Sequence, residues 1–165
     1  MSQAQDPNEL LPVVDHEDRQ VELAPRAAVH AQGLLHRAVH VLVFTPDGRL
    51  WLQRRSMAKD THPGKWTSSA SGHVDPGEGY EAAARRELGE ELGLELALTY
   101  VGKVAACMAT ENEFTAVYRA VTGQELRPDP VEISHMALFS LDQARALAAD
   151  HAQSSPSLEA VLGLI

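Results

Sequence analysis

The sequence predicts an α/β fold in which helices cover a mixed β-sheet. Segments with the alternation of β-strands and segments with helical spacing follow one another without a regular strand–helix–strand repeat, which favours a mixed sheet with flanking helices. The chain has 165 residues, of which 44% are hydrophobic. This is enough for one substantial core and too little for two. We therefore expect a single domain over 1–165.

The N-terminal region is expected to begin with little regular structure. Residues 1–12 are polar and contain prolines, which favours a loosely ordered start. Residues 13–23 have apolar ends around a charged centre, a pattern typical of a short strand, a turn and a second strand. Pro25 suits the start of a helix and Gly33 its end, so a short helix is predicted over 26–32.

A β-hairpin is predicted next. Residues 37–44 are rich in valine and alternate, the Thr-Pro-Asp-Gly run at 45–48 is typical of a turn, and the strand pattern resumes at 50–54. The polar residues 56–64 are predicted to form a loop.

The longest predicted helix spans 81–92. Ala84, Leu88 and Leu92 are four residues apart, so they form one stripe that faces the core. Gly93 marks the end of this helix, because glycine readily adopts the left-handed conformation with which many helices stop.

Strands and helices alternate irregularly after this point. Extended segments are predicted at 96–108 and 114–121, followed by a connection rich in glycine and proline. A short strand at 136–140 precedes a helix at 141–149. A last helix opens at Pro156, because proline fits the first helical position.

The acidic composition argues against one large class of partners. The net charge is −9, whereas proteins that bind nucleic-acid polymers usually need a basic surface. Cys107 is the only cysteine, so no internal disulfide can form, which suits a reducing compartment. The sequence has neither a signal-peptide pattern nor an apolar run long enough for a membrane span. We therefore expect a cytoplasmic protein with neither a nucleic-acid polymer nor a membrane as partner.

Three glutamates, Glu87, Glu90 and Glu91, lie within one turn of the longest helix. Glu87 neighbours both of the others, and each like-charged pair at this spacing costs roughly 0.2–0.5 kcal/mol. A hard divalent cation reverses this effect, because Mg²⁺ takes oxygen ligands and is commonly shared between carboxylates and the phosphates of a substrate. An ordinary solvated acidic face is the simpler alternative, but it explains neither the glycines before the helix nor the fixed spacing.

This stretch resembles the signature of the Nudix family, a glycine and a glutamate followed at fixed spacing by an Arg-Glu-aliphatic-any-Glu-Glu-any-Gly-aliphatic run. The matching positions are Gly72, Glu78, Arg86, Glu87, Leu88, Glu90, Glu91, Gly93 and Leu94. The resemblance implies a Nudix-type α/β/α sandwich with a mixed sheet, with a core at about 37–149 and an N-terminal extension at 1–36. We expect Glu78 to brace the loop against the helix.

The resemblance also implies roles for the glutamates. Glu87 and Glu91 would bind the essential Mg²⁺ or Mn²⁺, Glu90 would bind a further ion or orient the attacking water, and the carbonyl of Gly72 would add a ligand. Arg86 can pair with Glu90 and hold the carboxylates in place. The implied reaction is hydrolysis of a phosphoanhydride linkage in a nucleoside-diphosphate derivative or a related small molecule, with Glu87 and Glu90 as catalytic residues.

Within this superfamily, a second resemblance points to the isopentenyl-diphosphate isomerase branch. It is carried by VHAQGLLHRAVHVLVF, by RRSMAKDTHPGKWTSSASGHVDPGE and by the Glu-Asn-Glu tripeptide at 111–113. That branch binds a metal through histidines and two glutamates, and the positions that match are His36, His73, Glu111 and Glu113, with His30 a looser match. On a strand, Glu111 and Glu113 would project from one face.

Three histidines with carboxylates suit Mn²⁺ or Zn²⁺, so the resemblance implies a second, mixed His/Glu metal site and a catalytic role for Glu113. Taken singly, each histidine is better explained by an ordinary hydrogen bond or an exposed position.

One position departs from the isomerase pattern. The isomerases carry a cysteine directly before the Gly-His pair, which exchanges the carbon-bound proton, whereas this chain has Ser71. A thiol titrates near pKa ~8.5 and an unperturbed alcohol far higher, so a serine does not readily replace it. The glutamate motif, which the isomerases tend to lose in part, is complete. Both differences favour a hydrolase over an isomerase, and a Nudix-derived binding module without turnover is the third hypothesis.

Basic residues near the predicted loop are candidates for binding the diphosphate. Arg54, Arg55 and Lys65 supply positive charge, and arginine presents a planar fork to phosphate oxygens. A plain surface role is equally compatible with these residues and with Lys59. The apolar C-terminal residues 161–165 are expected to pack either on the core or on a second copy in a homodimer.

Overall fold

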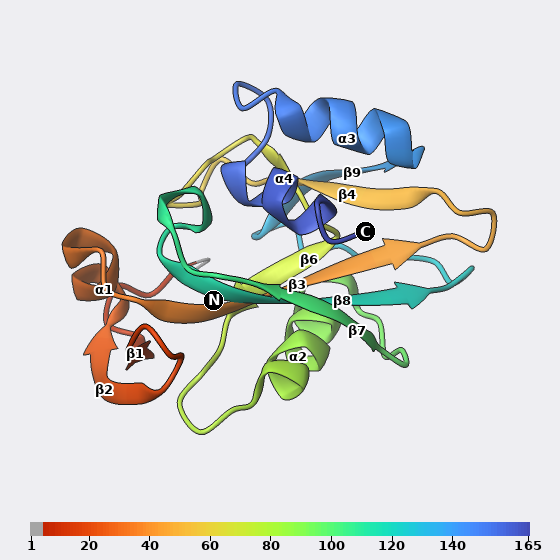
Figure 1. The fold of residues 1–165 in the computed structure, drawn as a ribbon. Helices are drawn as coiled ribbons and strands as arrows, with labels where there is room; N and C mark the ends of the chain where they lie inside the picture. Colours follow the sequence, from red (N-terminus) through yellow and green to blue (C-terminus); the bar gives the residue numbers. More distant parts are fainter. Residues whose placement is uncertain (1–4) are drawn as a thin grey trace.

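A seven-stranded mixed sheet forms the centre of the computed structural model, which describes residues 5–165 (Figure 1). Its strands are β3 (His36–Phe44), β4 (Leu50–Arg55), β5 (Trp66–Thr67), β6 (Ala70–His73), β7 (Thr99–Val104), β8 (Glu113–Val121) and β9 (Ile133–Phe139). Strand β3 is parallel to β8 and antiparallel to β4 and β6, whereas β7 pairs with β8, and β5 and β9 pair with β4. One parallel pair among antiparallel pairs confirms the predicted mixed sheet.

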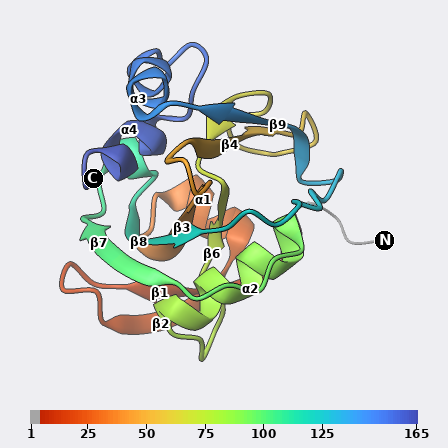
Figure 2. The same ribbon diagram turned by 90° about the vertical axis from the view of Figure 1, so that its right-hand side faces the viewer.

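Helices cover both faces of this sheet. They are α1 (Arg26–Gln32), α2 (Tyr80–Leu92), α3 (Leu141–Ala149) and α4 (Pro156–Leu162), with one 3-10 turn, η1 (Met108–Thr110). Figures 1 and 2 show α2 on one side of the sheet and α3 and α4 on the other. The α/β/α sandwich implied by the sequence is confirmed, and α1 and α3 have the predicted bounds.

Successive side chains of β3 point to opposite faces of the sheet, so they belong to two separate hydrophobic clusters. The cluster beneath α2 includes Val39, Val41, Val43, Ala84, Leu88 and Leu92. The cluster beneath α3 and α4 includes Leu42, Phe44, Leu50, Leu52, Val117 and Leu158. The predicted core stripe of α2 is therefore confirmed. His36 and His40 are an even number of residues from Leu42 on the strand, so their side chains lie on the same face as Leu42, which α4 partly covers.

Strands β3 and β4 diverge beyond a single register pair, Phe44 and Leu50. Past this pair, β3 runs beside β6, while β4 runs beside β5 and β9. Residues of β3, β4, β5 and β6 line a cavity of about 680 Å³. The divergence of two central strands therefore opens the sheet where the cavity lies.

The N-terminal extension is a hairpin, β1 (Leu10–Val14) and β2 (Gln20–Pro25), followed by α1. Residues 1–4 of the expected loose start lie outside the described residues. The remainder of that start is more regular than predicted, because strand β1 begins at Leu10. Burial explains this order, since Leu11 is 1% exposed. The hairpin and α1 lie at one end of the sheet (Figure 1).

One other difference from the predicted elements is local. The extended segment predicted over 96–108 contains a strand only at β7. At the C-terminus, Val161 and Leu162 are buried in the chain's own core beneath α3. No helix among residues 5–165 combines the length and the apolar character needed to cross a bilayer.

Candidate active site

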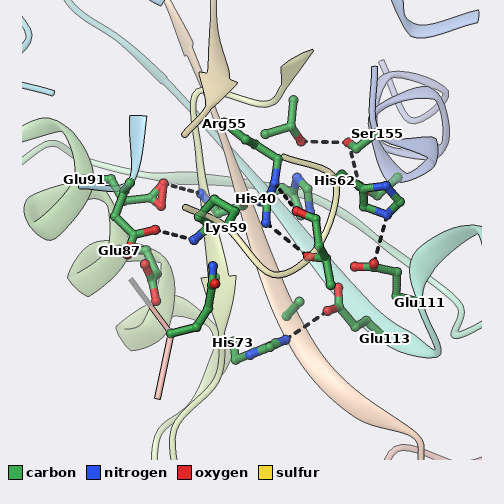
Figure 3. A pocket seen from close by; sticks show the side chains of 18 of the residues that line it. His40, Arg55, Lys59, His62, His73, Glu87, Glu91, Glu111, Glu113 and Ser155 are labelled. Carbon is green, nitrogen blue, oxygen red and sulfur yellow. Dashed lines mark hydrogen bonds and ion pairs between the residues drawn. The ribbon is translucent and has the colours of Figure 1, made fainter. Parts of the chain in front are cut away.

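The cavity brings together most of the predicted site residues. Those that line it are Arg55, Gly72, His73, Glu87, Glu90, Glu91, Glu111 and Glu113. Figure 3 shows Glu87 and Glu91 on one side and His62, Glu111 and Ser155 on the other. Residues from five elements of the sheet and from α2 thus converge on one space.

Glu87 and Glu91 lie on the side of α2 that faces Gly72. A Cβ added at Gly72 would lie 2.2 Å from the carboxylate of Glu87, so only glycine allows this close approach. Burial raises the pKa of Glu87 well above its usual value, and repulsion by Glu91 raises it further. Burial also raises the pKa of Glu91 to about 7. Glu90 differs from both, because its side chain is 61% exposed at the rim.

The carboxylate of Glu91 is held from the sheet side. Its Oε1 accepts hydrogen bonds from Nε2 of Gln53 at 2.8 Å and from the backbone N–H of Ser71 at 3.2 Å. Gln53 is fixed in turn, because its Nε2 also donates to the carbonyl of Ser69 at 3.1 Å. These contacts fix the position of a carboxylate that burial alone disfavours.

Arg86 joins the motif loop to the helix. Its guanidinium donates to Glu78 at 2.9 and 3.0 Å, to Glu87 at 2.8 Å and to Glu90 at 3.3 Å. It also donates to the carbonyl of His73 at 3.0 Å. The hydrogen bonds to Glu78 are the main reason that the pKa of Arg86 is raised. The expected pair of Arg86 with Glu90 is present, and Glu78 braces the loop against α2.

A cluster of three histidines lies beside the carboxylates. His30, His36 and His73 offer ligand atoms that are all within 4.8 Å of one another. Nδ1 of His36 donates to the carbonyl of Leu34 at 2.9 Å, so its Nε2 carries a lone pair. Among the described residues, Nε2 of His36 and Nε2 of His30 are buried without a hydrogen-bond partner. An N–H donated to a carbonyl is the usual support of a metal-binding histidine.

Glu113 completes this cluster. Its Oε1 accepts from Nε2 of His73 at 3.1 Å and lies 3.3 Å from Nε2 of His36. Burial disfavours the charged carboxylate, but the two histidines hold the pKa of Glu113 below its usual range. A lone pair on His36 beside a carboxylate oxygen is repulsive without a proton or a cation between them. The donor set therefore fits a metal ion.

The pairing of β3 with β8 and with β6 brings together His36, Glu113 and His73, which are far apart in the sequence. Strand β3 is parallel to β8 with His36 beside Glu113, and antiparallel to β6 with Ala38 beside His73. Because alternate residues of a strand share a face, the three side chains converge on one side of the sheet.

The prediction that Glu111 and Glu113 share a strand face is wrong. Glu111 and Asn112 have left-handed backbone angles, with φ of 56° and 62°, and β8 begins only at Glu113. The chain therefore turns between the two glutamates. Oε1 of Glu111 lies 2.9 Å from Nε2 of His62, across the cavity from Glu87 and Glu91 (Figure 3).

Of the three basic residues predicted to bind the diphosphate, only Arg55 lines the cavity. Arg54 and Lys65 are not among the residues that line it. Arg54 neighbours Arg55 on the strand and points away, with Nε donating to the carbonyl of Gly64 at 2.9 Å. Lys65 donates to the carbonyl of His151 at 2.7 Å. Their positions argue against the predicted role.

Other residues reach the cavity without having been predicted. Nη1 of Arg26 lies 3.0 Å from Nδ1 of His73, and Glu132 lines the cavity as the ion-pair partner of Lys59, which was already considered from the sequence. No local pattern marks Arg26 or Glu132, which stand in a short helix and a connection. His40 carries a usable signal, since it follows His36 by four residues on an alternating strand.

Comparisons with known proteins agree with this geometry. The family model described as the NUDIX domain matches residues 34–161. An isopentenyl-diphosphate Delta-isomerase of Nocardia farcinica is 39% identical over 158 residues, covering 91% of this chain and 90% of that protein. The uncharacterised Nudix hydrolase PA4841 of Pseudomonas aeruginosa is 36% identical over 144 residues, covering 84% of this chain and 85% of that protein.

A solved structure extends the likeness to three dimensions. The crystal structure of DR0079 from Deinococcus radiodurans has a TM-score of 0.84 and 27% sequence identity, covering 94% of this chain and 98% of that one. The residues that the family model matches include Gly72 and the helix α2 with the three glutamates. This chain therefore belongs to the Nudix family.

Proposed function

We propose that this protein is a metal-dependent hydrolase that cleaves a phosphoanhydride linkage in a small-molecule diphosphate. The observation that carries this proposal is the burial of two neighbouring carboxylates, Glu87 and Glu91, against Gly72 at the wall of the cavity. Two buried acids repel each other and lose hydration, and a cation shared between them would offset both costs. The relative from Pseudomonas aeruginosa, which is named an uncharacterised Nudix hydrolase, supports the hydrolase class.

Each residue has a role in this proposal. Glu87 and Glu91 would hold Mg²⁺ or Mn²⁺, and the bound ion would neutralise phosphate charge and lower the pKa of water. Glu90, at the rim, orients the attacking water or accepts its proton. Arg55 and Lys59 also line the cavity, where their charges can bind phosphate oxygens.

His30, His36, His73 and Glu113 would form a second metal site of nitrogen and oxygen ligands, suited to Mn²⁺ or Zn²⁺. The buried, unpartnered Nε2 atoms of His30 and His36 support this site. Its content is measured by metal analysis of wild-type protein and of His36→Ala after dialysis, and equal Mn²⁺ and Zn²⁺ contents in the two would contradict it.

A product-resolved screen tests the hydrolase. Nucleoside diphosphates and triphosphates, dinucleotides, nucleotide sugars and isoprenoid diphosphates are incubated with Mg²⁺ or Mn²⁺. We expect cleavage of a phosphoanhydride by the wild type and none by the double variant Glu90→Gln, Glu91→Gln. If the wild type binds one of these compounds tightly and leaves it intact for hours, the protein is a binding module instead.

An isomerase is the second candidate, because the relative from Nocardia farcinica carries that name and the His36–His73–Glu113 cluster lies next to the cavity. Ser71 lines the cavity where the isomerases have cysteine, and Cys107 is exposed and is not among the residues that line it. Incubation with isopentenyl diphosphate and Mg²⁺ in D₂O separates the two activities, since only isomerisation places deuterium on carbon without releasing phosphate.

A further inference from the structure

Arg26, the first residue of α1, reaches from the N-terminal extension to the cluster of histidines and lines the cavity. Its guanidinium is anchored by Asp60, which accepts from Nε at 3.2 Å and from Nη2 at 3.3 Å. The remaining nitrogen, Nη1, lies 3.0 Å from Nδ1 of His73 and 3.7 Å from a carboxylate oxygen of Glu9. The side chain of Arg26 is only 11% exposed, so water competes little with these contacts.

The contact with Arg26 fixes the position of the proton on His73. A guanidinium has donors and no acceptor, so Nη1 donates and Nδ1 of His73 must carry a lone pair. The neutral ring then has its proton on Nε2, and this N–H donates to Oε1 of Glu113 at 3.1 Å. Figure 3 shows His73 directed at Glu113. Both ring nitrogens are therefore engaged, one with an arginine and one with a carboxylate.

The other two histidines of the cluster differ from His73 in this respect. The Nε2 atoms of His30 and His36 are buried and have no hydrogen-bond partner within residues 5–165. Nδ1 of His36 donates to a backbone carbonyl, which leaves the lone pair on its Nε2. Two histidines are therefore open to a metal ion, whereas the third is held by Arg26.

Coordination through His73 and the contact with Arg26 exclude each other. Coordination through Nδ1 uses the lone pair that now accepts from Arg26. Coordination through Nε2 requires that nitrogen to lose its proton, and the neutral ring then carries the proton on Nδ1, facing a guanidinium that cannot accept it. The positive charge of Arg26 also repels a cation in the cluster. Either mode of coordination therefore requires the guanidinium to move away from the ring.

We propose that Arg26 competes with the second metal ion for His73. While the guanidinium contacts the ring, the site offers two histidines and one carboxylate. His73 becomes a further ligand only when Nη1 withdraws, and Asp60 can keep hold of the rest of the guanidinium. Arg26 is thus a positioning residue that lowers the affinity of the site for its metal. This inference rests on the proposed second metal site, because it assumes that the histidine cluster holds an ion.

The position of the proton on His73 is tested in the wild-type protein without metal. Proton–nitrogen correlation spectra of the imidazole rings distinguish a protonated nitrogen from one with a lone pair, and the spectrum of His73→Gln identifies the signals of His73. Near neutral pH we expect the proton on Nε2. A proton on Nδ1 would overturn the inference, because Arg26 could not then donate to that atom. This test does not depend on the stability of any Arg26 variant.

Calorimetric titration with Zn²⁺ tests the competition itself. The binding event that His36→Ala abolishes is assigned to the histidine cluster. We expect Arg26→Met to bind Zn²⁺ in this event about tenfold or more tightly than the wild type, since binding no longer breaks a charge-assisted hydrogen bond. An arginine that supported the site would give the opposite change. Arg85→Met, an exposed change on α2, is the matched control and should bind as the wild type.

A double-mutant cycle separates the contact with His73 from the charge of Arg26. Loss of the charge alone strengthens cation binding whether or not His73 is present. We therefore expect the gain in Zn²⁺ affinity caused by Arg26→Met to be several-fold smaller in the His73→Gln background than in the wild type. An equal gain in the two backgrounds would show that Arg26 acts by its charge alone, and the competition for His73 would be refuted.

Failure of the metal site is distinguishable from failure of this inference. If neither the wild type nor Arg26→Met shows Zn²⁺ binding that depends on His36, the second metal site does not exist and the inference fails with it. If both proteins bind Zn²⁺ there with equal affinity, the site stands and only the role of Arg26 is refuted. Neither result bears on the separate carboxylate site at Glu87 and Glu91.

Discussion

At the scale of single residues, the contact between Gly72 and Glu87 ties the sequence motif to the chemistry. A Cβ at Gly72 would lie 2.2 Å from the Glu87 carboxylate, so Gly72→Ala must displace that side chain. We expect kcat/KM for diphosphate hydrolysis to fall about 100-fold, since shifts of about 1 Å in a site have effects of that size. Steady-state kinetics and a circular dichroism spectrum measure activity and folding together.

Gly79→Ser is the matched control for this substitution. A Cβ at Gly79 meets no atom within 4 Å, and serine is a good N-cap for α2. A Gly72→Ala enzyme as active as Gly79→Ser would show that the position of Glu87 does not matter.

Buried histidines make stability depend on pH. Burial lowers the pKa of His40 to about 4, against about 6.5 in an unfolded chain. The folded state therefore binds fewer protons, and stability is lost as the pH falls from about 6.5 through 4. For His40 the full loss is about 3 kcal/mol. Urea unfolding measures the free energy of unfolding at pH 7.5 and at pH 4.5. The difference between these two free energies should be smaller for His40→Gln than for the wild type.

The exposed His151 provides the comparison, because His151→Gln should leave the difference unchanged. His73, whose pKa burial also lowers to about 4, keeps part of the pH dependence in His40→Gln. An unchanged difference in that variant would contradict the assignment to His40.

At the scale of elements, Asp18 fastens the β1–β2 hairpin to the core. Its carboxylate accepts from Arg37 at 2.7 Å, Tyr80 at 2.6 Å and Lys103 at 2.8 Å. Asp18→Ala leaves partly buried donors without their acceptor, so we expect a loss of about 3 kcal/mol in unfolding free energy. Hydrogen exchange should show the loss of protection concentrated in β1, β2 and α1.

Asp47→Ala is the control for this prediction, because Asp47 pairs only within an exposed turn. It should change stability by less than about 1 kcal/mol. If the two variants lose the same stability, or if protection falls evenly over the chain, Asp18 does not have this role.

Elements with strong local signals were predicted well. Proline at the start and glycine at the end place α1, and the spacing of Ala84, Leu88 and Leu92 places α2. Strands were predicted less well where the backbone departs from regular geometry. The left-handed turn at 111–112 has no glycine to announce it, so the start of β8 and the direction of Glu111 could not be predicted.

For the whole molecule, metal binding and folding are expected to be linked. Mg²⁺ at 100 times its dissociation constant should raise the unfolding free energy by about 2.7 kcal/mol, because the unfolded chain has no assembled site. Glu91→Gln should lose most of this gain, whereas Glu81→Gln, an exposed change on the same helix, should keep it. Calorimetric melting with and without Mg²⁺ measures the gain in unfolding free energy for each variant. If Glu91→Gln and Glu81→Gln gain equally, the ion does not bind at Glu91.

The sequence by itself determined the Nudix helix, its three glutamates and the glycine that admits them, because spacing along a helix and the stereochemistry of glycine are local properties. Only the tertiary structure decided which other residues reach the cavity. Arg26, His40 and Ser155 line it, whereas Arg54 does not. Strand pairing and the divergence of β3 from β4 set the positions of His40 and Arg54, and the packing of α1 and α4 against neighbouring strands sets those of Arg26 and Ser155. Contacts between strands far apart in the chain have no signature in either segment alone.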